Sequence, residues 1–333
     1  MKKVLSLILA LAMVFALAAC GEKQPSNDGN TDGDKPARGN VIMTFGTADT
    51  GGSMYPAGAA VSQVWTNNVQ GVKCNTQTST GSFQNCQDVS TGEVDVAVAT
   101  SDVVLNAYNG TGKFADIGKL DNLRVIGAVY TSVLSGVALK SSGLTYINEL
   151  LGKRVAVGPA ASATENATLA AFDVMGIDSS NTSLENLGLG DGADSVGDGI
   201  LDAAFGFAGL PIGGQLNLAA TKEIQVLDMT QEEIDKVLAG NAAYIQTKIP
   251  AGTYTGQDND ANTFGVKCLI IVTADMDADL VYDLCKAMNE HTEELAAGNA
   301  LLKDMTDPSF LCTQMPIPLH DGAQKYYSEQ GLI

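Results

Sequence analysis

The stretch FGTADTGGSMYPAG, residues 45–58, decides how the chain is expected to fold. Apolar β-forming residues at 41–45 predict a strand, and the glycines at 46, 51 and 52 favour a turn after it. A helix is expected next, because Ser53 is a good N-cap and apolar residues recur at helical spacing from Ala57 to Trp65. Such a turn presents unpaired N–H groups beside the positive end of a helix dipole. It can bind an anion, or it can be an ordinary βα connection.

Two further strands are predicted to end in polar residues, as the first one does. The strand at 72–78 leads into Ser79-Thr80-Gly81-Ser82, which opens a helix that runs to about Ser90. The strand at 92–99 ends at Thr100 and Ser101, before a helix at 102–108. Ligands of open α/β sheets bind outside the carboxyl ends of the strands. A ligand site is therefore expected at this edge.

Residues 1–20 resemble a bacterial lipoprotein signal. Lys2 and Lys3 precede an apolar run at 4–17, and small residues stand directly before Cys20. The resemblance implies cleavage before Cys20 and lipid attachment to its sulfur, which would anchor the chain to the cell membrane on the extracytoplasmic side. The alternatives are a plain signal peptide and a single membrane anchor, for which the apolar run is short against the ~20 residues that a span needs.

The segment at 21–40 has almost no apolar residue and is expected to be a flexible tether. The body at 41–333 suits two domains, at roughly 100 to 200 residues each. The whole chain has a formal charge of −19; without Lys2 and Lys3 it has 17 basic and 38 acidic residues, a charge of −21. This acidity argues against binding to nucleic acid or directly to anionic lipid.

Three motifs in the first part of the body resemble the TAXI family of solute-binding proteins, which serve TRAP (tripartite ATP-independent periplasmic) transporters. Residues 45–58 resemble the family's G-x-x-x-G-G-x-Y-x-x-G signature. Residues 80–85 resemble its T-G-G-S-x-x-N segment, and residues 92–102 its G-x-x-D-x-x-x-x-x-x-D stretch.

Four later motifs extend the resemblance over the whole body. Residues 151–159 resemble the G-K-R-V-x-V-G-x strand and residues 162–165 the G-S-G-T-E turn. Residues 199–205 resemble D-G-x-I-D-A-x-F, and residues 249–254 match I-P-A-G-T-Y. Each motif alone is weak, and their order makes the set specific. The resemblance implies an α/β fold with two lobes, of the type II periplasmic-binding-protein kind, in which each lobe is a mixed sheet flanked by helices and the lobes close on a solute.

The predicted limits are 41–135 for the first part of lobe 1, 136–260 for lobe 2 and 261–333 for the return to lobe 1. The elements expected after residue 120 are strands at 125–130 and 137–140, a short helix at 144–150, a strand at 155–158, a helix at 162–175, a strand at 265–273 and a helix at 280–295. Residues 188–192 are glycine-rich and are expected to form a loop.

The solute is expected between the lobes, where helix N-termini converge. Arginine occurs only at 38, 124 and 154, so no arginine clamp for a carboxylate is expected. Hydroxyls and backbone N–H groups would hold the anion, with helix capping as the alternative role for each hydroxyl. Glu165 would receive a ligand ammonium or would only stabilise its helix. The complete predicted set is Gly52, Ser53, Tyr55, Thr80, Gly81, Ser82, Asn85, Thr100, Ser101, Tyr130, Ser162, Thr164, Glu165 and Phe207.

Three departures from the family pattern fall at this expected site. The second glycine of the Thr80 segment is missing, Thr100 or Ser101 stands where a glutamine is expected, and Ala161 and Ala163 replace glycines. These changes alter hydrogen-bonding groups and backbone freedom, so the ligand of any one family member cannot be carried over. The resemblance points to a carboxylate-bearing solute, either an amino acid of the glutamate or glutamine kind or another small organic acid.

No catalytic constellation is evident in the sequence. His291 and His320 are expected to be solvated surface residues, and the chain lacks H-E-x-x-H, G-x-S-x-G and G-x-x-x-x-G-K-S/T motifs. The acidic residues at 191–198 and at 258–260 lack the spacing of an EF-type calcium loop. The cysteines other than Cys20 allow at most two disulfides and are expected to be small buried apolar residues; they are Cys74, Cys86, Cys268, Cys285 and Cys312.

These observations predict a monomeric, lipid-anchored solute receptor that delivers its ligand to a TRAP permease, without catalysis, cofactor or metal. One alternative is a surface lipoprotein that binds a solute for sensing or display without transport. Another is an exported α/β enzyme that uses the same cleft.

Overall fold

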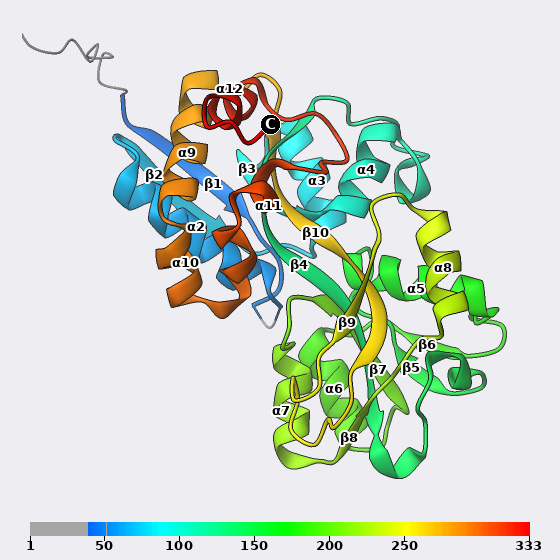
Figure 1. The fold of residues 1–333 in the computed structure, drawn as a ribbon. Coiled ribbons are helices and arrows are strands. Elements are labelled where there is room, and N and C mark those ends of the chain that lie inside the picture. Colours follow the sequence, from blue (N-terminus) through cyan, green and yellow to red (C-terminus); the bar gives the residue numbers. More distant parts are fainter. Residues whose placement is uncertain (1–38, 51) are drawn as a thin grey trace, which may run out of the picture. The chain divides into compact units, whose positions relative to one another are not determined.

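Two long antiparallel strands, β4 (Leu123–Leu139) and β10 (Ala261–Thr273), form the centre of the fold in the computed structural model (Figure 1). The structure describes residues 39–50 and 52–333, so the predicted signal, the lipid site at Cys20 and nearly all of the tether lie outside it. The described residues belong to one unit. Within the described residues, every helix is too short or too polar to cross a bilayer.

A ten-stranded mixed sheet runs through this unit in the order β2-β1-β3-β10-β4-β7-β5-β6, with β8 on β4 and β9 on β10. We use lobe 1 for the part around the parallel strands β1 (Val41–Gly46), β2 (Val72–Gln77) and β3 (Val96–Thr100). Lobe 2 is the part around β5 (Arg154–Ala156), β6 (Ser183–Glu185), β7 (Ala203–Ala208), β8 (Ile224–Val226) and β9 (Ile245–Ile249). β10 pairs with β3 of lobe 1 and β9 of lobe 2, and β4 pairs with β10 and with β7 and β8 of lobe 2. The predicted α/β fold with two lobes and a mixed sheet is therefore present.

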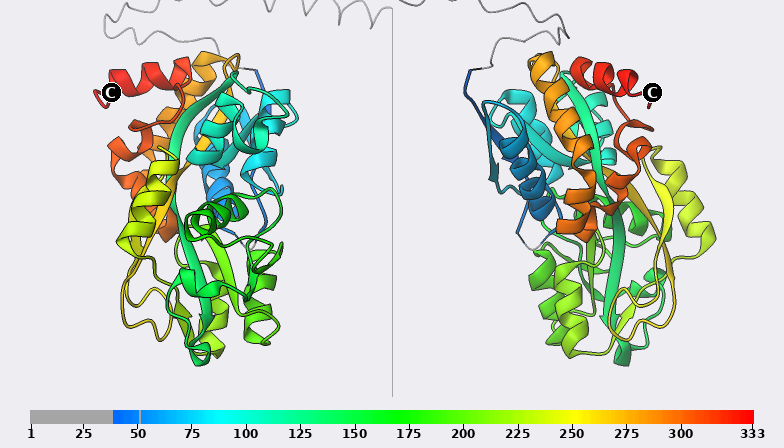
Figure 2. Two further views of the ribbon diagram at one scale, coloured as in Figure 1. Left: turned by 90° about the vertical axis from the view of Figure 1, so that its right-hand side faces the viewer. Right: turned by 60° about the vertical axis from the view of Figure 1, so that its left-hand side comes forward.

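Helices cover both parts of the sheet (Figure 2). Those of lobe 1 are α2 (Met54–Asn68), α3 (Ser82–Thr91), α4 (Ser101–Asn109), α9 (Ala278–Glu290), α10 (Thr292–Gly298), α11 (Pro308–Cys312) and α12 (Asp321–Glu329). Those of lobe 2 are α5 (Ala163–Met175), α6 (Leu189–Gly197), α7 (Gly213–Thr221) and α8 (Gln231–Gly240). Short 3-10 turns are η1 (Gly112–Phe114), η2 (Lys140–Ser142), η3 (Ile147–Leu150) and η4 (Ala300–Thr306).

The core of lobe 1 holds the opening strand and helix in place. Phe45 of β1 stacks on Trp65 of α2 with ring centroids 5.4 Å apart, and both side chains are buried. The Trp65 indole N–H donates to the Leu284 carbonyl at 3.0 Å, which pairs its polar atom inside the core. The helical face that starts at Ala57 therefore packs inward, as its spacing predicts.

The prediction of two strands at 125–130 and 137–140 was wrong, because β4 runs through without a break. Hydroxyl residues between them suggested a turn, but the ladder continues and pairs Ser132 with Val266 and Ser135 with Gly206. The buried Ser135 hydroxyl donates to the Gln215 side chain at 2.6 Å, so its polar atom is satisfied inside the sheet. Serine can thus occupy a central strand when a partner is supplied by another element.

Two further local predictions were wrong. Residues 188–192 open helix α6 at Leu189 and do not form a loop. The helix expected at 280–295 is divided at His291, whose Nδ1 contacts the Ala287 carbonyl at 2.8 Å. That side-chain contact competes with the helical hydrogen bonds of the same turn.

His320 is buried and not a solvated surface residue. Its ring accepts a hydrogen bond from the Gly322 N–H at 3.1 Å and caps α12. Burial lowers the pKa of this imidazole, because a charged ring is poorly solvated there. By contrast, the cysteine prediction is confirmed, since the described cysteines are buried and none is in a disulfide.

Candidate functional site

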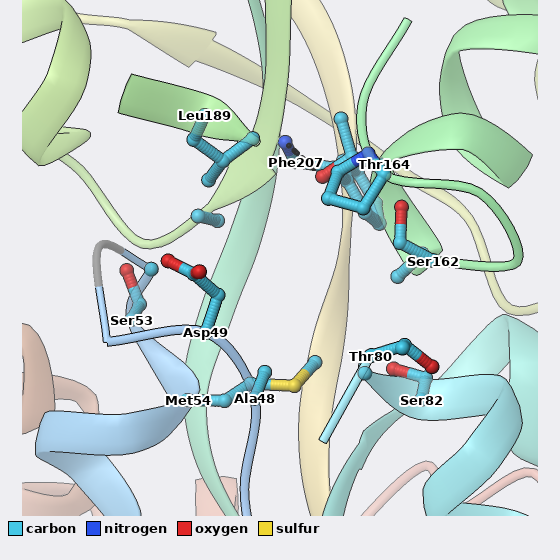
Figure 3. Close-up of a pocket in the computed structure, with 15 residues that line it drawn as sticks. Ala48, Asp49, Ser53, Met54, Thr80, Ser82, Ser162, Thr164, Leu189 and Phe207 are labelled. Carbon is cyan, nitrogen blue, oxygen red and sulfur yellow. Dashed lines mark hydrogen bonds between the residues drawn. The ribbon is translucent and has the colours of Figure 1, made fainter. Parts of the chain in front are cut away.

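A pocket lies between the lobes, at the carboxyl ends of the strands (Figure 3). Lobe 1 contributes the turn before α2 and the turn before α3, and lobe 2 contributes the first turns of α5 and α6 and the end of β7. The cavity measures about 60 Å³. Its lining residues are Ala48, Asp49, Gly52, Ser53, Met54, Thr80, Gly81, Ser82, Pro159, Ser162, Ala163, Thr164, Leu189, Phe207 and Ala208.

The structure brings eight of the predicted residues together in this lining. They are Gly52, Ser53, Thr80, Gly81, Ser82, Ser162, Thr164 and Phe207. They come from four separate segments of the chain, and the two helix starts at Gly81 and Ser162 meet closely: a methyl group on Gly81 would lie 3.9 Å from the Ser162 Cα atom. That they contact a solute stays a prediction.

Three pocket hydroxyls accept a hydrogen bond from the backbone. Ser82 accepts from the Thr100 N–H at 3.1 Å, Ser162 from the Glu165 N–H at 3.1 Å, and Thr164 from the Phe207 N–H at 3.1 Å. All three residues are buried. Because a hydroxyl has one proton and two lone pairs, each of these groups keeps its O–H proton to donate to another acceptor. The oxygens are fixed in place by the same bonds.

The first turns of α3 and α5 add backbone donors to this group of hydroxyls. Gly81 stands before α3 with φ of 114°, a conformation that favours glycine, and Ser162 caps α5. N–H groups in the first turn of a helix have no partner within the helix, and the helix dipole is positive there. Together these donors can bind a carboxylate or another small anion.

Ser53 and Thr80 have other partners. The Ser53 hydroxyl donates to the Gly209 carbonyl of lobe 2 at 3.2 Å, so it bridges the two sides of the pocket. It does not cap α2 through its side chain. The Thr80 hydroxyl donates to the Gln84 side chain at 3.0 Å and is exposed.

Six predicted residues do not line the pocket, and most of them are buried or bonded elsewhere. The Asn85 amide donates to the carbonyls of Thr47 and Val98 at 2.6 and 2.7 Å, which ties the end of β1 to β3. Thr100 is buried behind Ser82, and Tyr130 is buried in β4. Tyr55, Ser101 and Glu165 also lie outside the lining.

Glu165 joins the lobes instead of lining the pocket. Its carboxylate pairs with Lys113 of lobe 1 and accepts from the Ala161 N–H at 2.8 Å and from Asn186 at 3.0 Å. Partial burial on its own would raise the pKa of Glu165, but the hydrogen bonds from Lys113, Ala161 and Asn186 outweigh it and lower the pKa.

A second connection between the lobes is centred on Asp102, the first acid of α4. Its buried carboxylate accepts from Asn166 of α5 at 2.7 Å and from the Tyr244 hydroxyl at 3.2 Å. Burial raises the pKa of Asp102 above its ordinary value, although the hydrogen bonds from Thr100, Asn166 and Tyr244 oppose this. Contacts of this kind hold α4 against α5 next to the pocket.

Sequence reasoning missed several lining residues. Asp49 lies in the quoted opening stretch, and its position beside the glycines of that stretch could have marked it. Met54 and Leu189 give the pocket apolar walls, and the sequence does not indicate Leu189 because its neighbouring glycines predict a loop where α6 begins. The arginines that the structure describes do not line the pocket; Arg154 pairs with Asp202 at 2.9 Å.

Ser101 lines a different cavity of about 500 Å³, bordered by Lys267 and Gln314 on the side of β10. Lys267 donates to the Phe310 and Thr313 carbonyls at 3.0 and 2.9 Å, so its ammonium holds the end of α11. Within the described ranges, no group of three or more His, Cys, Asp or Glu side chains is placed to hold a metal ion.

The fold and the position of the pocket define a class: an α/β protein with two lobes and the architecture of periplasmic solute-binding proteins. The chain belongs to the NMT1-like family, whose model matches residues 45–331.

Solved structures share this fold at low sequence identity. PhnD1 from Prochlorococcus marinus (MIT 9301), in complex with methylphosphonate, has a TM-score of 0.53 and 11% identity, over 88% of this chain and 99% of that one. A protein from Bordetella bronchiseptica RB50 has a TM-score of 0.50 and 12% identity, over 87% of this chain and 98% of that one. The alkanesulfonate-binding protein SsuA from Xanthomonas axonopodis pv. citri, bound to MOPS, has a TM-score of 0.49 and 14% identity, over 88% and 85%.

Proposed function

We propose that this protein is an extracytoplasmic receptor that captures a small carboxylate-bearing solute between its lobes and delivers it to a membrane transporter. One observation carries the proposal: the buried hydroxyls of Ser82, Ser162 and Thr164 keep a proton to donate, and they stand beside the first turns of α3 and α5. This arrangement offers several donors to an anion without an arginine.

The proposal extends to the transporter and the membrane anchor. The ordered motifs favour the TAXI group and a TRAP permease, which uses an ion gradient and no ATPase. Cys20 is proposed to carry the lipid. The lobes are proposed to keep the limits 41–135, 136–260 and 261–333, and to close about β4 and β10, which pair with strands of both lobes. The receptor is proposed to act as a monomer.

A thermal-shift panel tests solute capture. The purified protein is melted with each of a set of amino acids and small organic acids, and a solute at 100 times its Kd should add about 2.7 kcal/mol to the free energy of unfolding. We expect a clear rise in Tm with at least one carboxylate. No rise with any compound, in protein that native mass spectrometry shows to be free of bound solute, would contradict the proposal.

Transport is tested separately from binding. Cells that lack the receptor should lose uptake of the labelled solute and recover it when the gene is restored. Unchanged uptake would favour the alternative of a surface lipoprotein for sensing or display.

A further inference from the structure

Asp49 supplies the one charged side chain among the described residues that line the pocket. It stands in the turn between β1 and α2, where its side chain is exposed at the pocket margin. Figure 3 shows Asp49 and Ser53 on one side of the pocket, and Thr80, Ser82 and Ser162 on the other. In this view the Asp49 carboxylate lies at the edge of the pocket and turns toward Ser53.

The two sides of the pocket differ in electrostatic character. Asp49 is negative, whereas the opposite side has the first turns of α3 and α5 and the hydroxyls of Ser82 and Ser162. Backbone donors and helix dipoles make that side attractive to a negative group. A ligand that fits both sides therefore carries a positive group and a negative group.

We propose that Asp49 recognises an ammonium group of the solute, so that the receptor selects an amino acid over an organic acid of the same size. This inference rests on the proposed function and adds a specificity-determining residue to it. A carboxylate can accept as many as four hydrogen bonds, so Asp49 can bind an ammonium in addition to another partner. Glu165, the residue predicted for this role, is engaged with Lys113 and Asn186 outside the pocket.

An amino acid and the matching 2-oxo acid differ in the group that they present to Asp49. An amino acid presents N–H donors and a positive charge to Asp49. The 2-oxo acid with the same side chain presents a carbonyl oxygen at that position, and its net negative charge is repelled by the carboxylate. Rejection of a competitor by an uncompensated like charge is a common source of binding specificity.

Isothermal titration with matched ligand pairs tests the inference. The probes are the common amino acids other than proline, each with the 2-oxo acid that shares its side chain. We expect the wild-type protein to bind at least one amino acid about 10- to 100-fold more tightly than its 2-oxo partner, which is the size expected for a charged hydrogen bond. Asp49→Asn and Asp49→Ser should both remove most of this difference. Asp116→Asn, an exposed acid of lobe 1 away from the pocket, should keep it.

Each outcome is decisive. A wild-type protein that prefers the 2-oxo acid, or Asp49 variants that keep the full preference, would overturn this inference and leave the receptor function intact. If no compound of either set binds to solute-free protein, this inference is overturned, and the broader panel of organic acids then decides whether the receptor function falls with it.

Discussion

At the scale of single residues, the pocket hydroxyls combine a structural bond with a donor for the solute. Ser162 shows this best, because its oxygen accepts from the Glu165 N–H at 3.1 Å as the N-cap of α5 and its proton stays available. Helix capping and ligand binding were alternatives in the sequence, and here one side chain can do both.

Substitution of Ser162 separates the two roles. Ser162→Ala should lower the free energy of unfolding by about 1 kcal/mol, the usual effect of a lost N-cap, and should also weaken solute binding. Thr230→Ala is the matched control, since Thr230 caps α8 by accepting from the Glu233 N–H at 3.3 Å and lies outside the pocket. Chemical denaturation and titration calorimetry give the two quantities. Equal solute affinity in both variants would show that Ser162 only caps.

Asp102 should make the stability of the folded protein depend on pH, and its raised pKa fixes the direction of the change. Its pKa is raised in the folded protein, so between about pH 4, the value for an unfolded aspartate, and the raised pKa the folded state binds more protons than the unfolded state. The contribution of Asp102 to stability is therefore largest at low pH and falls as pH rises. The Tm of Asp102→Asn minus that of the wild type should increase between pH 4 and pH 7.

Asp173→Asn, which changes an exposed acid of α5, is the control for a general effect of charge. A difference in Tm that stays constant with pH for Asp102→Asn would contradict the assignment.

The sequence could predict residues whose role follows from local spacing, but not those whose partner comes from elsewhere. Ser162 and Gly81 stand at helix starts and were found. Asn85 was expected to face the solute, yet its amide bonds the carbonyls of Thr47 and Val98, an arrangement that depends on how β1 and β3 pair. Likewise, Glu165 forms an ion pair with Lys113, which is more than fifty residues away in the sequence. Such partners are set by tertiary structure, which no local pattern contains.

At the scale of elements, β4 and β10 connect the lobes, and their packing is tight. Gly265 of β10 lies between Val133 of β4 and Ile245 of β9. A methyl group at Gly265 would overlap the Ser132 carbonyl oxygen. This close approach explains a glycine within a central strand.

Gly265→Ala should therefore destabilise the fold by about 1–3 kcal/mol, the usual range for overpacking. Gly240→Ala is the control, because the space around Gly240 at the end of α8 is open. Its expected effect is neutral or slightly stabilising, by up to about 1 kcal/mol. Urea denaturation of both variants measures the difference. Equal stabilities would mean that β4 and β10 separate easily at this point.

The order and type of most elements could be read from the sequence, whereas their limits in the connecting strands could not. The strand at 41–45 and the helix that starts after Ser53 agree with β1 and α2 within a residue or two. The middle of β4 was missed because its hydroxyl residues suggested a turn, and only the pairing of Ser135 with β7 and Gln215 makes them suitable for a buried strand. The glycines at 188–192 predict a loop, whereas the structure has helix α6 from Leu189 onward.

At the scale of the whole unit, side chains of the protein itself join the lobes beside the pocket. Lys113 pairs with Glu165, Asp102 accepts from Asn166, and Ser53 donates to Gly209. We expect these contacts to form when the lobes are together and to break when they part, so they favour the closed arrangement.

Lys113→Met tests this linkage. The variant should shift the ligand-free protein toward open lobes and weaken solute binding by up to about five-fold, since a partly exposed ion pair contributes at most about 1 kcal/mol. Lys236→Met removes an ion pair with Glu232 within α8 and serves as the control. Small-angle X-ray scattering of the ligand-free variants and calorimetry with solute make the comparison. Identical behaviour of the two variants would assign no role in closure to Lys113.

The most direct measurement is a crystal structure with the solute that gives the largest rise in Tm. The account predicts a carboxylate within hydrogen-bonding distance of the hydroxyls of Ser82, Ser162 and Thr164, with its positive group, if it has one, toward Asp49. A solute bound in the cavity beside Lys267, or one whose carboxylate makes none of these three contacts, would contradict the account.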